Sequence, residues 1–570
     1  MRNSGECCGS AIDYVRLLAP RATAIRSAMS TSMSTPTIKH ALSITRAQNF
    51  AAWYQEVISA ADMAEESGVR GCMVIKPWGY GIWERIQFLM DKEIKAAGCQ
   101  NCYFPLFIPL SYFAKEAEHV EGFAKEMAVV THHRLISDGK GGLVPDPDAK
   151  LEEPLIVRPT SETVIGAAMA RWIQSWRDLP MLTNQWANVV RWEMRTRMFL
   201  RTSEFLWQEG HTAHADEADA RAETMCALEM YRVFAEDVLA MPVIAGEKPE
   251  NERFPGAVAT YSIEAMMQDG KALQAGTSHY LGTGFAESMG IRFQEKDGGH
   301  ALCHTTSWGT STRMIGGVIM THGDDDGLRL PPAIAPQQVV IIPMLRESDE
   351  DAAVLDYAHA LAADIRAQSA LGEPVRVLVD TKATKASTKR WDYIKKGAPL
   401  IVEIGPRDVA ADKAAVIRRD RLYREDGKLD TIFMQRADFL SQVSTLLTDI
   451  QTGLHGEALS RRDAAIQTMT DWAEVEAYYK GSEDAVKGWI SVAWSKPSGA
   501  ALDVVETKLK TLKLTIRNAP LSRHSRASGN PEKPDDLGPR LRGGDEMGAG
   551  TNCIFTGQPS IETILIGRSY

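Results

Sequence analysis

A loop rich in arginine, between two apolar segments, is the part of this chain best suited to chemistry. Residues 188–190 and 205–207 are expected to form paired strands, so the chain between them makes a hairpin. No acid occurs from 194 to 202, and the arginines there are Arg195, Arg197 and Arg201. Planar guanidinium groups match phosphate oxygens in paired hydrogen bonds, so the hairpin fits a polyphosphate site. Taken alone, the cluster fits a solvated hairpin with surface arginines equally well.

The elements that must position this loop are those of a mixed α/β domain. Apolar positions recur three and four residues apart in 49–66 and 80–97, which predicts two helices. Short apolar runs at 103–108, 155–157 and 315–320 are interpreted as strands between turns. Alternating helices and short strands favour an α/β fold for the main part of the chain.

The chain changes character near residue 336, where three prolines mark a hinge. The pattern that follows is strand, helix, strand, helix, strand, at 339–344, 349–368, 375–380, 385–396 and 400–404. This order predicts a small domain with a mostly parallel sheet.

We expect four parts in this chain, because it is long for a single domain. They are an N-terminal extension at 1–36, a main domain at 37–332, a small α/β domain at 333–452 and a C-terminal domain at 453–570. Within the last, residues 522–547 have almost no apolar content, so we expect a disordered, exposed insertion. A basic RNA-binding arm is the alternative, which five acids in the segment weaken.

The N-terminal extension has two interpretations. Residues 1–36 are rich in Arg, Ser and Ala, with Glu6 and Asp13 as the acids, and this composition resembles a transit peptide. An over-long gene model, with Met29 or Met33 as the true start, is favoured because the early acids fit a targeting helix poorly.

Bulk composition is that of a globular protein. The 570 residues are 44% hydrophobic and 24% charged, and no apolar run is long enough to span a bilayer. The net charge of −10 excludes a uniformly basic surface for nucleic acid but leaves local basic patches able to bind RNA. The eight cysteines show no disulfide spacing and no secretory segment is found, so we expect a reducing cytoplasm.

Four ordered blocks of the chain carry a family resemblance. Residues 188–214, NVVRWEMRTRMFLRTSEFLWQEGHTAH, resemble motif 2 of a class II aminoacyl-tRNA synthetase, and 68–86 with 102–109 resemble motif 1. The hexapeptide RPTSET, 158–163, is similar to a proline-recognition loop, and 306–332 is similar to motif 3. Together they resemble prolyl-tRNA synthetase, from about residue 50 to about residue 450.

The resemblance implies a proline–tRNA ligase of α/β (α+β) class. It implies an antiparallel-sheet catalytic domain, an α/β anticodon-binding domain and a small α+β C-terminal domain. ATP and L-proline would form prolyl-adenylate, which is then transferred to tRNA(Pro), with Mg²⁺ as the expected ion. A cytoplasmic homodimer formed through motif 1, without membrane association, is expected. Such chemistry depends on positioning and charge neutralisation and not on a protein nucleophile.

By the resemblance, arginines hold the nucleotide. Arg191 would bind the α-phosphate and the proline carboxylate. Arg313 would stack on the other face of the adenine or hold the γ-phosphate, and these two are the expected catalytic residues. Glu193 lies two residues from Arg191, on the same strand face, and would accept from the adenine amino group. The alternative for Arg191 alone is a strand-edge salt bridge. The expected ATP site is Arg191, Glu193, Arg201, Phe205, Gln274, Thr277 and Arg313.

The resemblance assigns proline recognition to the RPTSET loop and the WQEGH segment. Proline's amine is protonated at neutral pH and needs an acceptor, which Glu162 supplies, and an aromatic wall suits its flat ring. Taken singly, Trp207 fits a core residue and His211 a structural histidine. The expected proline site is Thr160, Glu162, Arg191, Trp207, Glu209, His211, His279, Trp308 and Ser311.

The basic run at 382–396 falls where the family has its anticodon-binding domain. Trp391 and Tyr393 are interleaved with its cations, and cations hold phosphates while aromatic rings stack on unpaired bases. A plain solvated helix is the alternative. The expected anticodon-binding residues are Lys389, Arg390, Glu403 and Arg407.

Two features of relatives are expected to be absent. The span from His214 to Thr305 is shorter than a typical domain of about 100–150 residues, so we expect the archaeal/eukaryotic-like type without the bacterial editing insertion. Only Cys553 follows Cys303, so we expect no structural zinc and no other metal held by protein ligands alone. The acids of HGDDD, 322–326, are interpreted as a loop beside motif 3 and not as a metal cluster.

Two other functions are weighed against the ligase. A synthetase-like protein that binds tRNA without making adenylate would be expected to lose Arg191, Glu193 or Arg313, and all are present. A class II synthetase for threonine, serine, histidine or glycine would not be expected to carry Thr160 and Glu162 together with WQEGH.

Overall fold

The computed structural model describes residues 40–114, 127–481, 486–521 and 551–570. The expectations for the extension at 1–36 and for the insertion at 522–547 lie outside the described residues.

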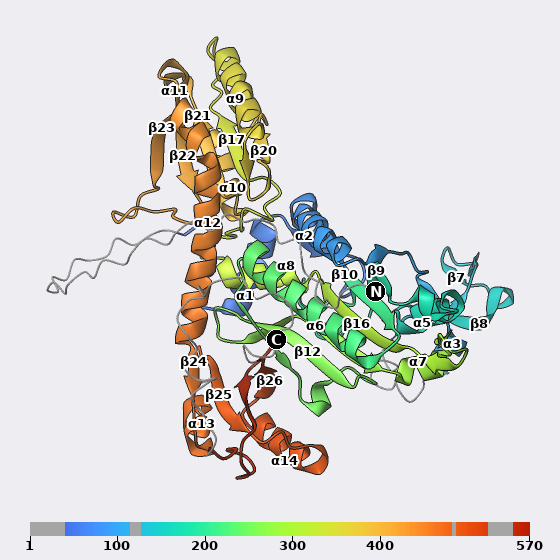
Figure 1. The fold of residues 1–570 in the computed structure, drawn as a ribbon. Coiled ribbons are helices and arrows are strands. Elements are labelled where there is room, and N and C mark those ends of the chain that lie inside the picture. The colour runs from blue at the N-terminus through green and yellow to red at the C-terminus, as the bar shows by residue number, and fades with distance from the viewer. Residues whose placement is uncertain (1–39, 115–126, 482–485, 522–550) are drawn as a thin grey trace.

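One continuous sheet forms the centre of the molecule (Figure 1). Among the described residues it has eleven strands, in the order β24 (Ile466–Thr468), β25 (Trp489–Trp494), β27 (Glu562–Gly567), β26 (Thr515–Pro520), β11 (Val243–Glu247), β12 (Ala259–Met266), β13 (Ala272–Gly282), β16 (His304–Ser311), β10 (Glu204–His214), β9 (Met181–Val190) and β3 (Gln100–Asn101). Every pair from β26 to β9 is antiparallel, which confirms the predicted catalytic sheet. The predicted arginine hairpin is β9 and β10.

Helices α6 (Glu217–Val233) and α8 (Arg313–His322) pack on this sheet, and α1 (Phe50–Ala60) and α2 (Pro77–Ala96) complete the same core. The buried residues of α1 recur at the predicted helical spacing: Trp53, Tyr54, Val57 and Ile58. Both N-terminal helices are therefore confirmed, with α1 shorter than the pattern predicted. The connecting elements are β1 (Ala64–Glu66), β2 (Met73–Ile75), α7 (Gly284–Met289), β14 (Arg292–Gln294) and β15 (His300–Leu302).

The prediction of a strand at 315–320 was wrong, because these residues lie within α8. All residues from Met314 to His322 are buried, so the helix has no polar face to reveal its period. A short apolar run without periodicity does not distinguish a buried strand from a buried helix. The error matters because α8 begins with Arg313 and therefore sets the position of that guanidinium.

A small sheet beside the main one carries the RPTSET loop. It consists of β4 (Phe107–Pro109), β8 (Lys150–Val157) and β5 (Val129–His132), with α3 (Leu110–Ala114) and the outer hairpin β6 (Leu135–Ser137) and β7 (Leu143–Pro145) beside it. β8 runs directly into the loop, and α5 (Glu162–Trp172) starts within it. Thr160 and Glu162 are thus held between a strand end and a helix start.

The second domain has the predicted β-α-β-α-β order. Its sheet is β20 (Val377–Val379), β17 (Val339–Pro343), β21 (Leu400–Ile404), β22 (Lys413–Arg418) and β23 (Thr431–Gln435), with helices α9 (Asp351–Arg366), α10 (Ala386–Lys395) and α11 (Pro406–Ala410) and the short pair β18 (Ser369–Ala370) and β19 (Glu373–Pro374). β20, β17 and β21 are parallel, and β22 and β23 add antiparallel strands.

The 29-residue helix α12 (Arg436–Ala464) links this domain to the C-terminal part and runs past the catalytic core (Figure 1). The boundary expected between 452 and 453 falls inside α12, where the backbone is continuously helical. The four-part division of the chain stays a prediction.

The C-terminal part adds α13 (Trp472–Tyr479) and α14 (Gly499–Lys510) to β24–β27. The strands predicted on both sides of 522–547 are β26 and β27, which pair with each other. β26 also pairs with β11, so the C-terminal strands extend the catalytic sheet edge to edge. Among the described residues no helix has the length and apolar character needed to cross a bilayer.

Candidate active site

A cavity of about 310 Å³ opens on one face of the main sheet, beside the RPTSET loop. The expected ATP and proline residues all line it, apart from Glu193 and Arg201; the lining ones are Thr160, Glu162, Arg191, Phe205, Trp207, Glu209, His211, Gln274, Thr277, His279, Trp308, Ser311 and Arg313. Residues from motif 2, motif 3 and the proline loop therefore share one hollow.

Strand alternation explains which side chains face the cavity. On β10, Trp207, Glu209 and His211 point to one face, and Gln208 and Gly210 point to the face that α6 covers. The Tyr231 hydroxyl of α6 donates to the Gln208 side chain, which fixes that second face. A Cβ on Gly210 would lie 2.2 Å from the Trp308 ring, so this position of WQEGH has no room for a side chain.

Trp308 thereby takes a different place from the one expected. Its backbone is part of the cavity wall, but its ring lies under Gly210, edge-on to Tyr231 in the core below the sheet. We interpret Trp308 as support for the cavity floor, in place of a direct contact to proline.

The two glutamates of the cavity, Glu162 in the RPTSET loop and Glu209 on β10, have different hydrogen-bond partners. Glu209 is buried and accepts hydrogen bonds from Ser161 and from Gln185, while its second oxygen lies 3.0 Å from His211 Nε2. Glu162 accepts from the Thr160 hydroxyl and is only partly buried. Glu209 therefore ties the loop to β9 and β10, and Glu162 keeps acceptor capacity for a ligand, since an ionised carboxylate offers about four lone-pair sites.

Arg158 of the same loop is a brace. It is buried, and its guanidinium donates to the carbonyls of Asn188 and Phe104 and to the Asn188 side chain. These bonds fasten the loop to the end of β9.

The two histidines of the cavity have opposite shifts. Burial acts to lower the pKa of His211, but the hydrogen bond and charge of Glu209, helped by the charge of Glu162, outweigh it and raise that pKa. Burial and the neighbouring His211 lower the pKa of His279 to about 3. His279 is therefore neutral at pH 7, bonded to Thr260 and packed against the Phe254 ring.

Arg191 lines the cavity between the RPTSET loop and two aromatic rings. Its Nε donates to the Pro159 carbonyl at 2.8 Å, and its guanidinium carbon is 5.7 Å from the Phe205 ring centroid and 5.3 Å from that of Trp207. Burial lowers the pKa of Arg191, and the nearby charges of Glu162 and Glu209 oppose that shift. The guanidinium thus connects the proline loop to the aromatic wall, where it can bridge two ligand groups.

Arg313 is the first residue of α8, and its Nε donates to the Leu200 carbonyl. Burial and the neighbouring charges of Arg201 and Arg191 lower the pKa of Arg313 to about 10. A group of like charges at the N-terminal end of a helix dipole is an environment that favours an anion.

Glu193 and Arg201 are outside the lining of the main cavity. Arg201 lines an adjoining chamber of about 280 Å³ that shares Gln274 and Arg313 with it, and Glu193 lies 3.9 Å from Arg201. Both belong to the loop between β9 and β10, at the mouth of the site.

One wall of the cavity was not predicted from the sequence. Residues 252–255, ERFP, line it from the connection between β11 and β12. The available signal was an Arg-Phe-Pro-Gly turn in a charged stretch, which is typical of many surface loops. The Phe254 ring lies 4.8 Å from the His279 ring, a contact between segments that no local pattern predicts.

Comparison with known proteins shows which family has this fold and these sequence motifs. The model of the class II tRNA synthetase core domain (G, H, P, S and T) matches residues 147–322, and that of an anticodon binding domain matches 338–435. The chain is 69% identical over 535 residues to the proline–tRNA ligase of Sphingopyxis alaskensis, covering 94% of this chain and 97% of the relative. It is 65% identical over 539 residues to that of Novosphingobium aromaticivorans, covering 94% and 100%.

Among solved structures, it matches the prolyl-tRNA synthetase from Cryptosporidium parvum complexed with L-proline and AMP. The TM-score is 0.78 at 31% identity, and the match covers 95% of this chain and 99% of that one. This chain belongs to the proline–tRNA ligase family. It is a class II aminoacyl-tRNA synthetase, which attaches proline to tRNA at the expense of ATP.

In this ligase the expected anticodon residues fall into two groups. Lys389 is 4% exposed and its ammonium donates to the Asp380 carbonyl, so it braces the domain and cannot reach a base. Tyr393 is also buried, with its hydroxyl on Asp380. A helix must bury one face, and these two residues occupy that face. Arg390 is partly exposed and pairs with Glu403, which is 6% exposed, and Arg407 is exposed.

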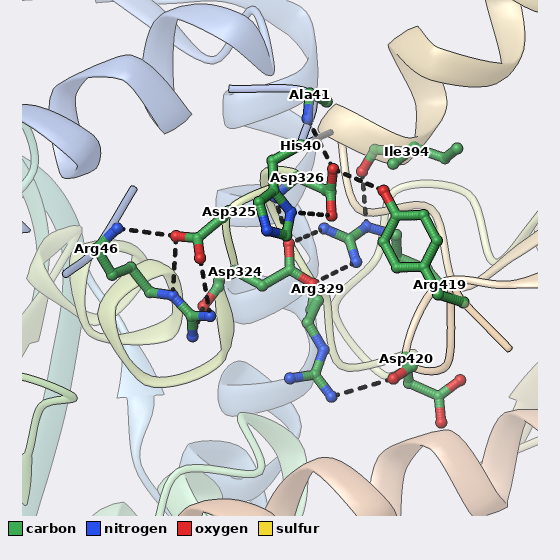
Figure 2. A network of polar contacts seen from close by, with 12 residues as sticks. His40, Ala41, Arg46, Asp324, Asp325, Asp326, Arg329, Ile394, Arg419 and Asp420 are labelled. Carbon is green, nitrogen blue, oxygen red and sulfur yellow. Dashed lines mark hydrogen bonds and ion pairs between the residues drawn. The ribbon is translucent and has the colours of Figure 1, made fainter. Parts of the chain in front are cut away.

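The HGDDD segment of the ligase is a junction (Figure 2). The Arg419 guanidinium of the anticodon-binding domain donates two hydrogen bonds to Asp324. Arg46 donates to Asp325, and the Ala41 amide donates to Asp326. Its acids therefore follow α8 in a loop, as interpreted, and the structure adds that they join three parts of the chain. In the part of the chain that the structure describes, no three His, Cys, Asp or Glu side chains are arranged to hold a metal.

Proposed function

We propose that the cavity forms prolyl-adenylate from L-proline and ATP and then passes the prolyl group to the terminal ribose of tRNA(Pro). Proline's carboxylate attacks the α-phosphate, and pyrophosphate leaves. The observation that carries this assignment is the single cavity that Glu162, Arg191 and Arg313 share. Positioning and charge neutralisation supply such catalysis without a protein nucleophile.

For proline, we assign the ammonium group to Glu162 and Thr160. Glu162 is a partly exposed carboxylate in the cavity wall, and Thr160 orients it by a hydrogen bond. Trp207 forms a wall for the ring, and Glu209, His211, His279 and Ser311 shape the pocket from the strands. A charge-assisted hydrogen bond from the amine to Glu162 fixes the orientation of the carboxylate toward Arg191.

For ATP, we assign the α-phosphate to Arg191, the purine to Phe205 and the outer phosphates to Arg313 and Arg201. Gln274, Thr277 and Glu193 would contact the nucleotide from the sheet and the motif 2 loop. The lowered pKa of Arg313 supports this, because a phosphate would offset the neighbouring cations that destabilise its charge.

Magnesium fits the donors of the site. Mg²⁺ takes one or two carboxylates together with phosphate oxygens. Glu252 lines both the cavity and the adjoining chamber, so its carboxylate would hold the ion beside the phosphates. When bound, the ion would neutralise phosphate charge.

We further propose that this ligase is a cytoplasmic homodimer that lacks an editing domain and a structural zinc. For dimerisation, Tyr80 and Phe88 are exposed on α2, in the region of motif 1. For editing, the span from 215 to 303 consists of α6, β11–β13, α7, β14 and β15, and these belong to the catalytic fold. The arginine of the anticodon helix, Arg390, with Glu403 and Arg407, would contact the anticodon.

Pyrophosphate exchange tests the function. The purified protein is supplied with ATP, labelled pyrophosphate and each of the amino acids in turn. Proline should give the fastest exchange, with weaker alanine and cysteine activity, because a pocket separates ligands that differ by a methylene only about 10–200-fold. Exchange that depended on threonine, serine, histidine or glycine would contradict the proposal, and so would the absence of exchange.

A further inference from the structure

A cluster of buried charges lies behind the cavity and includes a residue of the C-terminal part. Glu264 on β12 is 0% exposed, and both of its oxygens are engaged. Lys248, 2% exposed, approaches one oxygen at 3.1 Å, and Arg517 of β26, 5% exposed, donates to the other from Nη2 at 2.7 Å and Nε at 3.2 Å. The third arginine nitrogen, Nη1, donates to Thr515 at 2.7 Å.

The cluster is connected to the nucleotide side of the cavity in two ways. Glu264 pairs across the sheet with Gln274, at the place where the β12–β13 register shifts. Such an irregularity re-aims the side chains beside it, here Gln274 of the cavity wall. Lys248 also binds Glu252 at 2.9 Å, and Glu252 lines the cavity. A change at Glu264 therefore reaches two residues that face the nucleotide.

The C-terminal part also closes the adjoining chamber. The lining of this chamber combines Arg201, Gln274 and Arg313 of the catalytic domain with four residues of the C-terminal part, Thr515, Arg517, Ser569 and Tyr570. The site is thus bounded by two parts of the chain that meet where β26 joins β11.

The charges of the cluster balance as long as Arg517 is present. Lys248 and Arg517 offset Glu264 and Glu252. Without Arg517, one negative charge would stand uncompensated behind Arg313, in a medium where charges are poorly screened. That charge would draw Arg313 away from the ligand and repel phosphate oxygens. The two charges already act on Arg313, since Glu264 raises its pKa and Arg517 lowers it.

We propose that Arg517 is a positioning residue for ATP, acting through Glu264 on Gln274, Glu252 and Arg313. The inference rests on the proposed ATP site and extends it to the C-terminal part. It does not apply to proline, whose pocket lies on the far side of Arg191, beside the RPTSET loop.

The test is the exchange assay on Arg517→Met, with the KM for ATP measured at saturating proline and the KM for proline at saturating ATP. We expect the KM for ATP to rise by about tenfold or more and the KM for proline to stay within about twofold of wild type. Arg517→Lys retains the positive charge and should recover most of the ATP affinity. A general loosening of the fold would raise both constants together.

Asn518→Ala is the matched control. Asn518 is the next residue on β26 and donates to the Ile244 carbonyl at 3.0 Å and to the Ser262 carbonyl at 3.5 Å, so it fastens the same junction through backbone carbonyls and not through the Glu264 carboxylate. We expect this variant to keep both constants at wild-type values. An equal rise in the KM for ATP in Asn518→Ala would overturn the proposal, because the effect would then come from the junction itself.

If Arg517→Met does not fold, Thr515→Val replaces it, since this change removes the acceptor for Nη1 and, besides it, a long hydrogen bond of 3.5 Å to the Gly567 carbonyl. We expect the KM for ATP to rise by about two- to threefold in that variant. An unchanged KM for ATP in a folded Arg517→Met, or in Thr515→Val, would overturn the role of Arg517 and leave the proposed function intact. A wild-type protein without proline-dependent exchange would overturn both.

Discussion

Two acidic sites of the catalytic part, Glu162 at the cavity and the three aspartates at 324–326, differ in what their carboxylate oxygens bind. At the cavity, Glu162 accepts from Thr160 and faces the space where a ligand would lie. In the loop 324–326, each of the three carboxylates accepts hydrogen bonds from another segment of the chain. The Glu162 carboxylate can therefore still accept from a ligand. The three aspartates instead join the N-terminal segment and the anticodon-binding domain to the loop that follows α8.

The difference shows that acid content alone does not identify a functional site. Three consecutive aspartates suit a metal by composition, but their partners are Arg46, Arg419, Tyr423 and backbone amides. A single glutamate is less conspicuous, yet it keeps acceptor capacity in the same cavity as Arg191 and Arg313. The account therefore expects cavity residues to control rate and affinity, and junction residues to control stability.

The largest effect is expected from Arg191→Ala. If Arg191 bridges the α-phosphate and the carboxylate as proposed, removing its guanidinium should lower the exchange rate by about 10²–10³-fold or more. Exchange rates and thermal unfolding are measured on the same preparation. The melting temperature should stay near that of wild type. Exchange at the wild-type rate in this variant would contradict the assignment of Arg191 to the active site.

Glu162→Gln should come next. The amide keeps the shape but removes the charge that proline's ammonium group needs, which costs about 2–5 kcal/mol when a charged pair is truncated. The KM for proline should rise by more than about tenfold, while the KM for ATP stays unchanged. A parallel rise in both constants would mean that Glu162 supports the whole cavity and does not recognise proline.

Asp324→Asn tests whether the loop 324–326 controls stability. Arg419 is buried and loses its charged partner, so the free energy of unfolding should fall by about 3 kcal/mol, with proline-dependent exchange near wild type. Burial acts to raise the pKa of Asp324, but Arg419 outweighs it and lowers that pKa. The contribution is therefore present above the unfolded-state pKa of about 3.9 and is lost as pH falls through the lower folded-state value.

Asp325→Asn is the matched control for that experiment, because its partner Arg46 is one-third exposed and can turn to water. Urea unfolding of both variants should give the smaller loss for Asp325→Asn. A large loss of exchange in Asp324→Asn at unchanged stability would contradict the assignment of this loop to a junction.

A smaller effect, on the pH dependence of folding stability, is expected from the ion pair of His211 and Glu209. The pKa of His211 is raised in the folded state, so its stabilising contribution is complete below the unfolded-state pKa of about 6.5 and is lost as pH rises through the folded-state value. Stability of wild type and of His211→Asn is compared from pH 6 to pH 9. The gap between them should narrow with rising pH, and a gap that widens would reverse the sign of this shift.

The smallest effect is expected from deleting residues 522–547, which should leave exchange and tRNA charging unchanged. Loss of either activity in a deletion variant with wild-type thermal unfolding would assign a function to that segment.

Local patterns predicted much of the fold. The arginine hairpin, α2 and the β-α-β-α-β domain follow from periodicity and turn residues, which act over a few positions. The run at 315–320 was misassigned because full burial removes periodicity. The union of β26 with β11 and the continuity of α12 across 452–453 depend on contacts between distant segments, and no short window of sequence contains them.

The site was predicted at the level of motifs, and less well at the level of side-chain direction. Glu162, Arg191 and Arg313 line one cavity, and the ligand contacts that the resemblance implies for them stay predictions. Trp308 and Lys389 turned inward, because strand and helix faces must bury something and the sequence does not say which residue does so. The ERFP wall at 252–255 was missed because only tertiary packing brings it to His279.

The most direct test of the central claim is a crystal structure of this ligase with a non-hydrolysable analogue of prolyl-adenylate. The account predicts that the pyrrolidine nitrogen lies within hydrogen-bond distance of Glu162, that Arg191 contacts the phosphate mimic, and that Phe205 stacks on the adenine. An analogue bound in another hollow, or bound here with its amine away from Glu162, would contradict it.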